Sequence, residues 1–206
     1  MSKIFLPLIT LIALISLIFN FKYVLQKQNA NFKVTQVIDG DTFKIDFEGG
    51  KRVRLLGINA PETGKCLSQE AKEKLEKLVL NKTVSLTDQF TDPYGRIMAN
   101  VFVENVYINK EMSTSGFVRL DYTTNPRRDE LKIGYFHNDK CISVVSPKNC
   151  VIKGNVDTSQ KPYKAYLIPG CRNYTQAKID LSTDDQWFCT EKEALDAGFV
   201  KSSTCP

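Results

Sequence analysis

Apolar and polar positions alternate with two different periods between residues 31 and 122. A period of two predicts β-strands at residues 32–38, 42–47, 52–58, 83–88 and 97–103. Glu48-Gly49-Gly50 lies between the second and third runs and predicts a hairpin turn, because glycine readily adopts positive φ.

The longer period predicts helices. Ala71, Leu75, Leu78 and Val79 fall on one face of residues 66–80, with Lys and Glu opposite. A second, short helix is expected over residues 109–115, ended by Gly116, and residues 117–122 form a last extended piece. Five strands interrupted by helices predict a small barrel of the OB type.

The chain as a whole therefore predicts an α+β protein. It consists of a five-stranded OB-type β-barrel with packed helices, a small Cys-rich C-terminal module and an N-terminal hydrophobic anchor. The expected divisions are residues 1–30 for anchor and linker, 31–142 for the barrel domain, 143–149 for a linker and 150–206 for the module.

Residues 4–19 are apolar apart from Thr10 and Ser16. This segment is longer than the apolar part of most signal peptides and slightly short for a membrane span. No small-residue cleavage site follows, which favours an uncleaved signal anchor over a cleaved signal peptide. Either interpretation exports the rest of the chain, so we expect a membrane-anchored protein with its main domain outside the cytoplasm, or a secreted one.

The six cysteines form an even set that an oxidising compartment would convert to disulfides. Six cysteines allow 15 pairings, so the sequence leaves the connectivity open. No CxxC pair is present, which argues against a zinc ribbon and a thioredoxin-like protein. Four cysteines lie in residues 150–206, a segment too short to rely on its core alone. There, Thr190-Glu-Lys-Glu193 is a capping box that predicts a helix ended by Gly198.

The net charge of +5 is spread unevenly. Residues 1–30 carry three lysines and no acid, so the remaining residues carry only +2. Non-specific affinity for nucleic acid should therefore be modest. An enzyme that must release its product tolerates this, whereas a structural DNA-binding protein does not.

Two clusters combine acidic groups with a turn or a strand end. Asp39-Gly40-Asp41-Thr42 is either a simple turn or a pair of carboxylates at a strand edge that bind Ca²⁺. In the second cluster, Arg54 lies within apolar residues, and Asn59 and Glu62 follow at a turn fixed by Pro61. Arg54 and Glu62 could simply form an ion pair. Alternatively, Arg54 clamps a phosphate beside a carboxylate that activates water.

The third cluster is Asp92-Pro-Tyr94-Gly-Arg96. One interpretation is a tight turn with a solvated arginine. The alternative is a second arginine presented beside a tyrosine that stacks on a base.

Taken together and in this order, the three clusters resemble the staphylococcal nuclease (thermonuclease) family over residues 32–142. The resemblance implies that Asp41 is the principal ligand of one catalytic Ca²⁺, with Asn59, the carbonyl of Ala60 and nearby Asp39 completing the site. It further implies that Glu62 orients or deprotonates the attacking water and that Arg54 and Arg96 bind the scissile phosphate. Tyr94 and Tyr122 match tyrosines that pack against nucleotide.

Asn59 departs from the family, which usually has aspartate there. An amide oxygen still binds Ca²⁺, but the site loses one negative charge. Ala60 replaces a common threonine, and residues 125–141 leave little room for the last helix of the family. Cys66 and Cys141 flank this shortened region, and we expect them to pair and tie it to the barrel.

The C-terminal module resembles small modules appended to some bacterial exported nucleases. Its ending also resembles a cysteine-zinc module of alkylation-response proteins, although Leu167 stands where related modules often have histidine. A disulfide-stapled domain is favoured over a zinc site, since thiolate sites are rare in exported proteins. The one histidine, His137, lies outside every cluster and is expected at the surface.

The sequence thus predicts an exported, monomeric, Ca²⁺-dependent nuclease that hydrolyses phosphodiester bonds of DNA and RNA and contacts the membrane through its N-terminal segment. The alternative is a catalytically weak or inactive barrel that binds nucleic acid or a protein partner. A redox or metal-handling protein built on the cysteines is a third hypothesis, which the missing CxxC disfavours.

Overall fold

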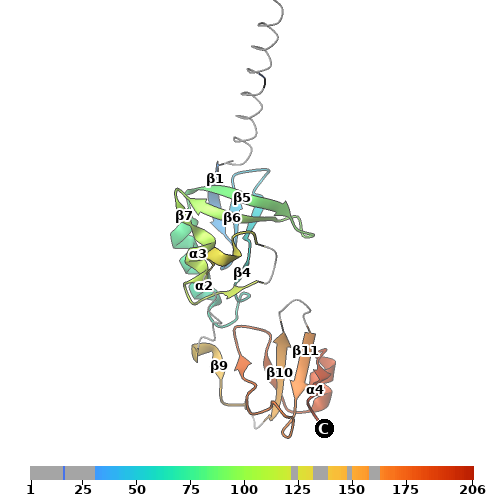
Figure 1. Cartoon of the computed structure of the whole chain (residues 1–206). Helices are drawn as coiled ribbons and strands as arrows, with labels where there is room; N and C mark the ends of the chain where they lie inside the picture. Colours follow the sequence, from blue (N-terminus) through green and yellow to red (C-terminus); the bar gives the residue numbers. More distant parts are fainter. Residues whose placement is uncertain (1–15, 17–30, 122–124, 132–138, 148–149, 158–162) are drawn as a thin grey trace, which may run out of the picture.

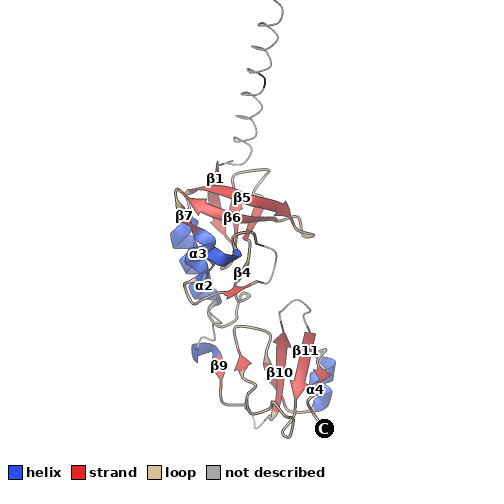
Figure 2. Cartoon of the chain, in the orientation of Figure 1, coloured by secondary structure: helices blue, strands red, loops and turns tan. Residues whose placement is uncertain are grey.

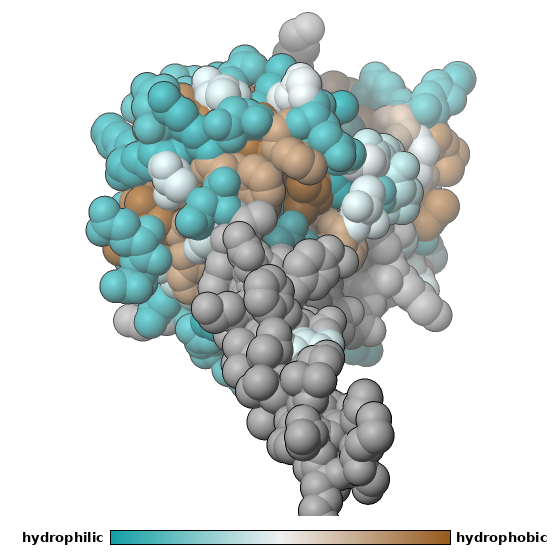
Figure 3. Space-filling model, turned by 90° about the horizontal axis from the view of Figure 1, so that it is seen from above, coloured by the Kyte–Doolittle hydropathy of each residue, from teal (hydrophilic) through white to brown (hydrophobic). Residues whose placement is uncertain are grey.

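The computed structural model describes residues 16, 31–121, 125–131, 139–147, 150–157 and 163–206. These residues form a larger sheet with helices and a smaller C-terminal sheet, which Figure 1 shows one above the other. Each sheet has its own cluster of buried apolar side chains. Seen from above, the visible face is mostly polar, with apolar atoms between the polar ones (Figure 3).

The larger sheet closes into a five-stranded barrel. Its strands are β1 (Asn31–Val37), β2 (Thr42–Ile45), β3 (Arg52–Leu55), β5 (Thr83–Thr91) and β6 (Ile97–Val103). They follow the order β3-β2-β1-β5-β6, and a parallel pairing of β3 with β6 joins the two ends. β7 (Val106–Tyr107) adds a short strand beside β6. The predicted OB-type barrel is confirmed.

The single strand predicted over residues 52–58 is wrong. The chain leaves the barrel after β3 and forms β4 (Ile58–Asn59), which pairs with β8 (Arg119–Leu120). The break falls at Gly57, whose φ of 78° lies in the left-handed region that favours glycine. A Cβ at this position would meet the side chains of Leu131 and Asn125 at 2.9 and 3.0 Å. This break turns Asn59 and the residues after it away from the barrel wall.

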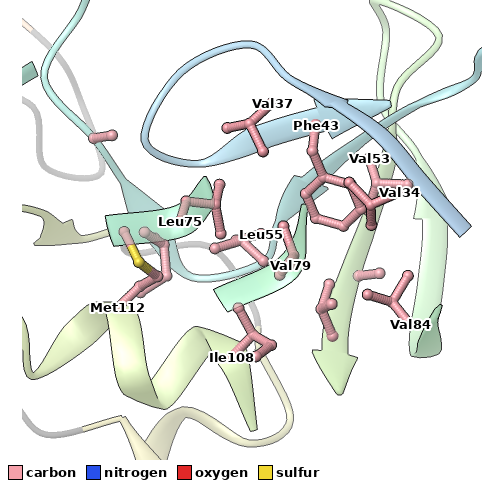
Figure 4. Packing of buried hydrophobic residues seen from close by; sticks show 14 of the residues in the cluster. Val34, Val37, Phe43, Val53, Leu55, Leu75, Val79, Val84, Ile108 and Met112 are labelled. Atoms are coloured by element: carbon pink, nitrogen blue, oxygen red, sulfur yellow. The ribbon is translucent and has the colours of Figure 1, made fainter. Parts of the chain in front are cut away.

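The helices α2 (Ser68–Val79) and α3 (Ile108–Ser113) cover the barrel on one side (Figure 2). α2 buries Ala71, Leu75 and Val79, three of the four apolar residues that predicted its inner face. Side chains from the strands point toward these helices in a single core (Figure 4). The predicted helices at residues 66–80 and 109–115 are therefore present, with bounds that differ by one or two residues.

Asparagine amides complete the hydrogen bonding at this end of the barrel. Asn109 is fully buried; its Oδ1 accepts from the N–H of Val101 at 2.9 Å, and its Nδ2 donates to the carbonyls of Leu56 and Ala99 at 2.9 and 3.2 Å. Asn125 donates to the carbonyl of Leu56 at 3.0 Å. Both amides thus satisfy the carbonyl of Leu56, which lies next to the strand break at Gly57.

The C-terminal sheet has the order β13-β10-β11-β14, from β10 (Ile152–Asp157), β11 (Tyr163–Leu167), β13 (Gln186–Phe188) and β14 (Val200–Lys201). α4 (Glu191–Asp196) packs on it, and its predicted capping box is present. Thr190 Oγ1 accepts from the N–H of Glu193 at 3.2 Å, and Glu193 Oε2 accepts from the N–H of Cys189 at 2.8 Å. Gly198 follows the helix with φ of 80°.

Short segments join the two parts. After the 3-10 turns η1 (Arg128–Glu130) and η2 (Asp139–Cys141), β9 (Ile142–Ser143) pairs with β12 (Ile179–Asp180). The expected Cys66–Cys141 disulfide is present, and Cys150–Cys189 and Cys171–Cys205 staple the C-terminal part. Since all six cysteines are in disulfides, the C-terminal part has no thiolate to offer a zinc ion.

Some predicted features lie outside the described residues. Apart from Ser16, the predicted anchor lies outside the described residues, as do Tyr122 and His137. Across the part of the chain that the structure does describe, no helix is long and apolar enough to cross a membrane.

We predict that Asn109→Ala lowers the free energy of unfolding by about 1–3 kcal/mol, because it leaves the buried N–H of Val101 unpaired and removes one donor each from the carbonyls of Leu56 and Ala99. Urea unfolding followed by circular dichroism measures this loss. Asn105→Ala, in the exposed turn before β7, is the matched control and should change stability by less than about 0.5 kcal/mol. Equal losses in the two variants would show that the buried amide is not needed.

Candidate functional site

A row of side chains crosses the outer face of the barrel at β2, β3 and β6. Thr42 pairs with Arg54, and Arg54 pairs with Met98, whereas their neighbours Phe43 and Val53 point into the core. Because side chains alternate along a strand, this register directs Arg54 outward. The alternation of apolar residues thus explains how an arginine can stand within an apolar run.

Asp41 lies just before β2, beside this row, and is 2% exposed. Its Oδ1 accepts hydrogen bonds from Thr42 Oγ1 at 2.7 Å and from the Arg54 guanidinium, with which it forms an ion pair. Its Oδ2 accepts from the N–H of Ala60 at 2.8 Å. Arg54 also donates to Asn59 Oδ1 at 2.8 Å. Four predicted site residues therefore meet in one hydrogen-bonded cluster.

The electrostatics of Asp41 reflect its removal from water. Burial raises the pKa of Asp41 to about 7, although Arg54 opposes this rise, as do the hydrogen bonds from Ala60 and Thr42. The neighbouring Asp39 raises the pKa further. Asp39 lies at the turn, where its Oδ1 accepts from the N–H of Asp41 at 3.0 Å. A second positive charge near Asp41 would stabilise its ionised form.

Gly40 holds this turn against the rest of the site. A Cβ on Gly40 would lie 2.4 Å from the Cβ of Ala71 in α2 and 2.8 Å from the Cβ of Ala60. The turn that carries Asp39 and Asp41 can therefore approach both the helix and the segment after β4 only because residue 40 has no side chain.

Glu62 differs from Asp41 in its surroundings. It is exposed, and among the described residues no side chain donates to its carboxylate, whereas its carbonyl accepts from the N–H of Lys65 at 2.9 Å. The ion pair of Arg54 with Glu62, which the sequence left open, is not formed, since Arg54 binds Asp41 and Asn59. Glu62 lines a cleft of about 140 Å³ together with Asn59 and Ala60. Its carboxylate is free to contact water there.

Arg96 and Tyr94 lie in the predicted turn between β5 and β6. The N–H of Gly95 donates to the carbonyl of Asp92 at 3.0 Å, and the guanidinium of Arg96 donates to Asp92 Oδ2 at 2.7 Å. Burial opposes ionisation of Asp92, but the hydrogen bonds from the N–H and side chain of Arg96 outweigh it and lower the pKa of Asp92. Tyr94 is 79% exposed, with Arg96 5.2 Å from its ring centre.

The strand register relates this turn to Arg54. Arg96 is two residues before Met98, the cross-strand partner of Arg54, so Arg96 and Arg54 project from the same face of the barrel. In this structure the guanidinium of Arg96 is paired with Asp92 rather than with any residue of the Asp41 cluster.

The residues present fit a hard cation by their chemistry. All the predicted ligands offer oxygen, which Ca²⁺ prefers, and the oxygens of Asp41 and Asn59 already converge on one positive group, the Arg54 guanidinium. Within the described ranges, however, no three His, Cys, Asp or Glu side chains converge on one point. Such an ion would rely on Asp41, Asn59 and main-chain oxygen, and it would share Asp41 with Arg54.

Sequence reasoning missed Arg119. It is the cross-strand partner of Asn59 in the β4–β8 pair and lines the cleft beside Glu62, together with Lys65. The signal was available, because Arg119 stands in Phe117-Val118-Arg119-Leu120, an apolar run of the same kind that singled out Arg54.

The geometry defines a class of protein: an OB-type barrel with a buried acid, an arginine and an exposed glutamate grouped on its outer face. Residues 52–138 match the model of a family described as staphylococcal nuclease homologue. The barrel part of this chain is thus similar to the staphylococcal nuclease family.

Individual relatives agree with the family. The chain is 34% identical over 98 residues to an "uncharacterized endonuclease" of Escherichia coli, covering 46% of this chain and 64% of that protein. It is 34% identical over 102 residues to another from Haemophilus influenzae, covering 48% and 57%. It is 32% identical over 106 residues to a thermonuclease of Staphylococcus hyicus, covering 46% and 63%. The chain thus spans less than two thirds of the length of each of these relatives.

We predict that Gly40→Ala lowers the free energy of unfolding by about 1–3 kcal/mol, because the added methyl group overlaps the Cβ of Ala71. Ala71→Gly alone should cost about 1 kcal/mol as a glycine within a helix. In the Gly40→Ala background, Ala71→Gly should cost less, since it removes the overlap. Thermal unfolding of the four proteins measures this coupling, and purely additive losses would contradict it.

Proposed function

We propose that this chain is a nuclease that hydrolyses phosphodiester bonds of DNA and RNA with the help of Ca²⁺. The observation that carries the proposal is the joining of Asp41, Arg54, Asn59 and Ala60 in one cluster, with the exposed carboxylate of Glu62 on the cleft beside it. The similarity of the barrel to this family and the endonuclease names of its relatives support the same activity.

A phosphodiester is an anion that repels hydroxide. Its hydrolysis therefore needs positively charged groups whose contacts with the phosphoryl oxygens become stronger in the transition state. Arg54 is suited to this role. Its hydrogen bonds to Asp41 and Asn59 use two of the five guanidinium N–H groups and fix its orientation. The remaining N–H groups can bind phosphoryl oxygens. Because Asp41 already holds the guanidinium in its orientation, no free energy is spent on orienting it during the reaction.

Arg96 supplies the second positive group in this proposal. It projects from the same face as Arg54, and because Asp92 accepts from its Nε–H, its other guanidinium N–H groups can bind a phosphate. Tyr94, beside it, offers an exposed ring on which a base can stack. Tyr122 has the same proposed role and lies outside the described residues.

Glu62 acts on the water. Because its carboxylate is exposed and unpaired among the described side chains, it can orient a water molecule for in-line attack and accept its proton. A bound Ca²⁺, held by Asp41, Asn59, the carbonyl of Ala60 and Asp39 nearby, would add positive charge on the phosphate and lower the pKa of bound water. No Ser, Cys or His nucleophile is needed.

We further propose that the protein works outside the cytoplasm, as a membrane-anchored or secreted monomer. Three disulfides support this location, because such bonds persist in oxidising compartments and are rare in the cytosol. The apolar residues 4–19 support it through their sequence.

A second candidate is a barrel that binds nucleic acid or a protein without cutting. The observation in its favour is that Arg54 engages both Asp41 and Asn59, the two side chains on which a Ca²⁺ site would chiefly depend. Asn59 also weakens such a site by one negative charge.

The first prediction is Ca²⁺-dependent cleavage of single-stranded DNA and RNA by the full-length chain, kept in solution with a non-ionic detergent. EDTA should abolish the cleavage, and Glu62→Gln should lower kcat by about 10²–10⁴-fold, the usual contribution of a general base. Glu104→Gln, an exposed glutamate in the turn before β7, is the control and should behave as the unchanged protein. Failure of a folded protein to cut at millimolar Ca²⁺ would favour the binding barrel.

The second prediction concerns Asn59→Asp, which restores a negative charge beside Asp41. Ca²⁺ should bind about tenfold more tightly, the gain expected for one added close charge in a partly exposed site. Isothermal titration calorimetry measures this affinity without reference to cleavage. Asn105→Asp adds the same charge in an exposed turn and should leave the affinity unchanged. Equal affinities for all three proteins would place the ion away from Asn59.

A further inference from the structure

The cleft beside Glu62 has walls from both parts of the chain. Asn59, Glu62, Lys65 and Arg119 line it from the barrel side, whereas Ser182 and Asp184 line it from the loop after β12. Since Asn59 and Glu62 belong to the proposed catalytic site, the cleft is continuous with that site. The C-terminal part, which the barrel family match at residues 52–138 does not include, thus contributes directly to the surroundings of Glu62.

The loop after β12 is fixed in this position. The N–H of Cys66 donates to the carbonyl of Leu181 at 3.1 Å, and the N–H of Leu181 donates to the carbonyl of Cys141 at 2.8 Å. The disulfide between Cys66 and Cys141 joins the two segments that hold Leu181. The loop after β12, which forms this wall of the cleft, is therefore part of the fold. It is held by Cys66, which follows the turn that carries Glu62.

Arg119 anchors the wall rather than offering a free charge. It forms an ion pair with Asp180, a carboxylate only 5% exposed, and donates to Ser182 Oγ at 2.9 Å. Removing either partner would leave a charge in a partly buried position, so this pair is expected to stay closed.

The second basic group on the cleft is exchangeable. Lys65 Nζ lies 3.1 Å from Asp184 Oδ1, and the two side chains are 37% and 60% exposed. An exposed pair of this kind contributes about 0–1 kcal/mol, so a phosphate of an incoming polyanion can replace the carboxylate. Lys65 is three residues after Glu62, on the same turn.

We propose that this cleft is a phosphate subsite of the substrate path, in which Lys65 binds the backbone phosphate next to the scissile one and Asp184 competes for Lys65. This inference rests on the proposed nuclease function and names a specificity-determining pair within it. The volume of about 140 Å³ leaves room for such a group. The carboxylate of Asp184 lowers the affinity for the polyanion, because a phosphate must displace it from Lys65.

The test is binding of a fluorescein-labelled single-stranded oligonucleotide of about ten nucleotides, within the usual site size of such folds, to the full-length oxidised chain. Fluorescence anisotropy in EDTA follows binding without cleavage. Lys65→Ala should weaken binding several-fold and reduce the slope of log K against log salt by about 0.7, the value for one phosphate contact with a single strand. Lys65→Arg should retain the affinity.

Asp184→Asn should strengthen binding several-fold, because it frees Lys65 and removes a repulsive charge. The gain should be smaller in the Lys65→Ala background, where only the repulsion is relieved. DNA and RNA oligonucleotides should respond alike, because the group recognised is the phosphate that both share.

The matched control is Lys192 with Asp196, an exposed ion pair at 2.6 Å in α4 that does not line the cleft. Lys192→Ala and Asp196→Asn make the same charge changes on the same chain. The proposal is overturned if Lys65→Ala and Asp184→Asn shift affinity and salt slope no more than these controls do, or if the unchanged chain does not bind the oligonucleotide.

Cleavage of the same oligonucleotide with Ca²⁺ tests the nuclease function separately from the phosphate subsite. A protein that cuts but shows no special effect of Lys65 and Asp184 keeps its nuclease function and loses the subsite. A protein that does not cut, yet binds with the predicted dependence on Lys65 and Asp184, keeps the subsite as a nucleic-acid site without hydrolysis.

Discussion

The ion pair of Asp41 with Arg54 is the interaction on which the site of this protein depends. A carboxylate that is 2% exposed is stable only if its charge is matched, and Thr42, Arg54 and the N–H of Ala60 do this together. These contacts join β2, β3 and the segment after β4. The same residues thus fix the strand edge, orient the arginine toward the outer face and hold the turn that carries Glu62.

A second constraint ties the C-terminal part to that turn. The disulfide between Cys66 and Cys141, the pairing of β9 with β12, and the ion pair of Arg119 with Asp180 act on neighbouring points. Their combined effect is to place the loop at Ser182 and Asp184 across the cleft from Glu62. The module is therefore more than a stapled appendage, because its contacts shape the space through which a substrate would reach the carboxylate.

Much of the fold could be predicted because it depends on near neighbours in the chain. The turn at Glu48-Gly49-Gly50, the inner face of α2 and the capping box at Thr190 each involve residues a few positions apart. The order of the three motif clusters was enough to indicate the family of the barrel. The strand over residues 52–58 failed because only tertiary contacts around Gly57 and Asn109 reveal the break after β3.

By itself, the sequence determined the barrel class and the helices, and it led us to expect the pairing of Cys66 with Cys141 and, through the family resemblance, the residues of the Asp41 cluster. Only the tertiary structure decided that Arg54 binds Asp41 rather than Glu62, and that Arg119 and Lys65 meet acids from the C-terminal part. The physical reason is distance along the chain: Arg119 and Asp180 are 61 residues apart. Ion pairs of that separation leave no periodic pattern in a sequence, because the folded backbone alone brings their charges together.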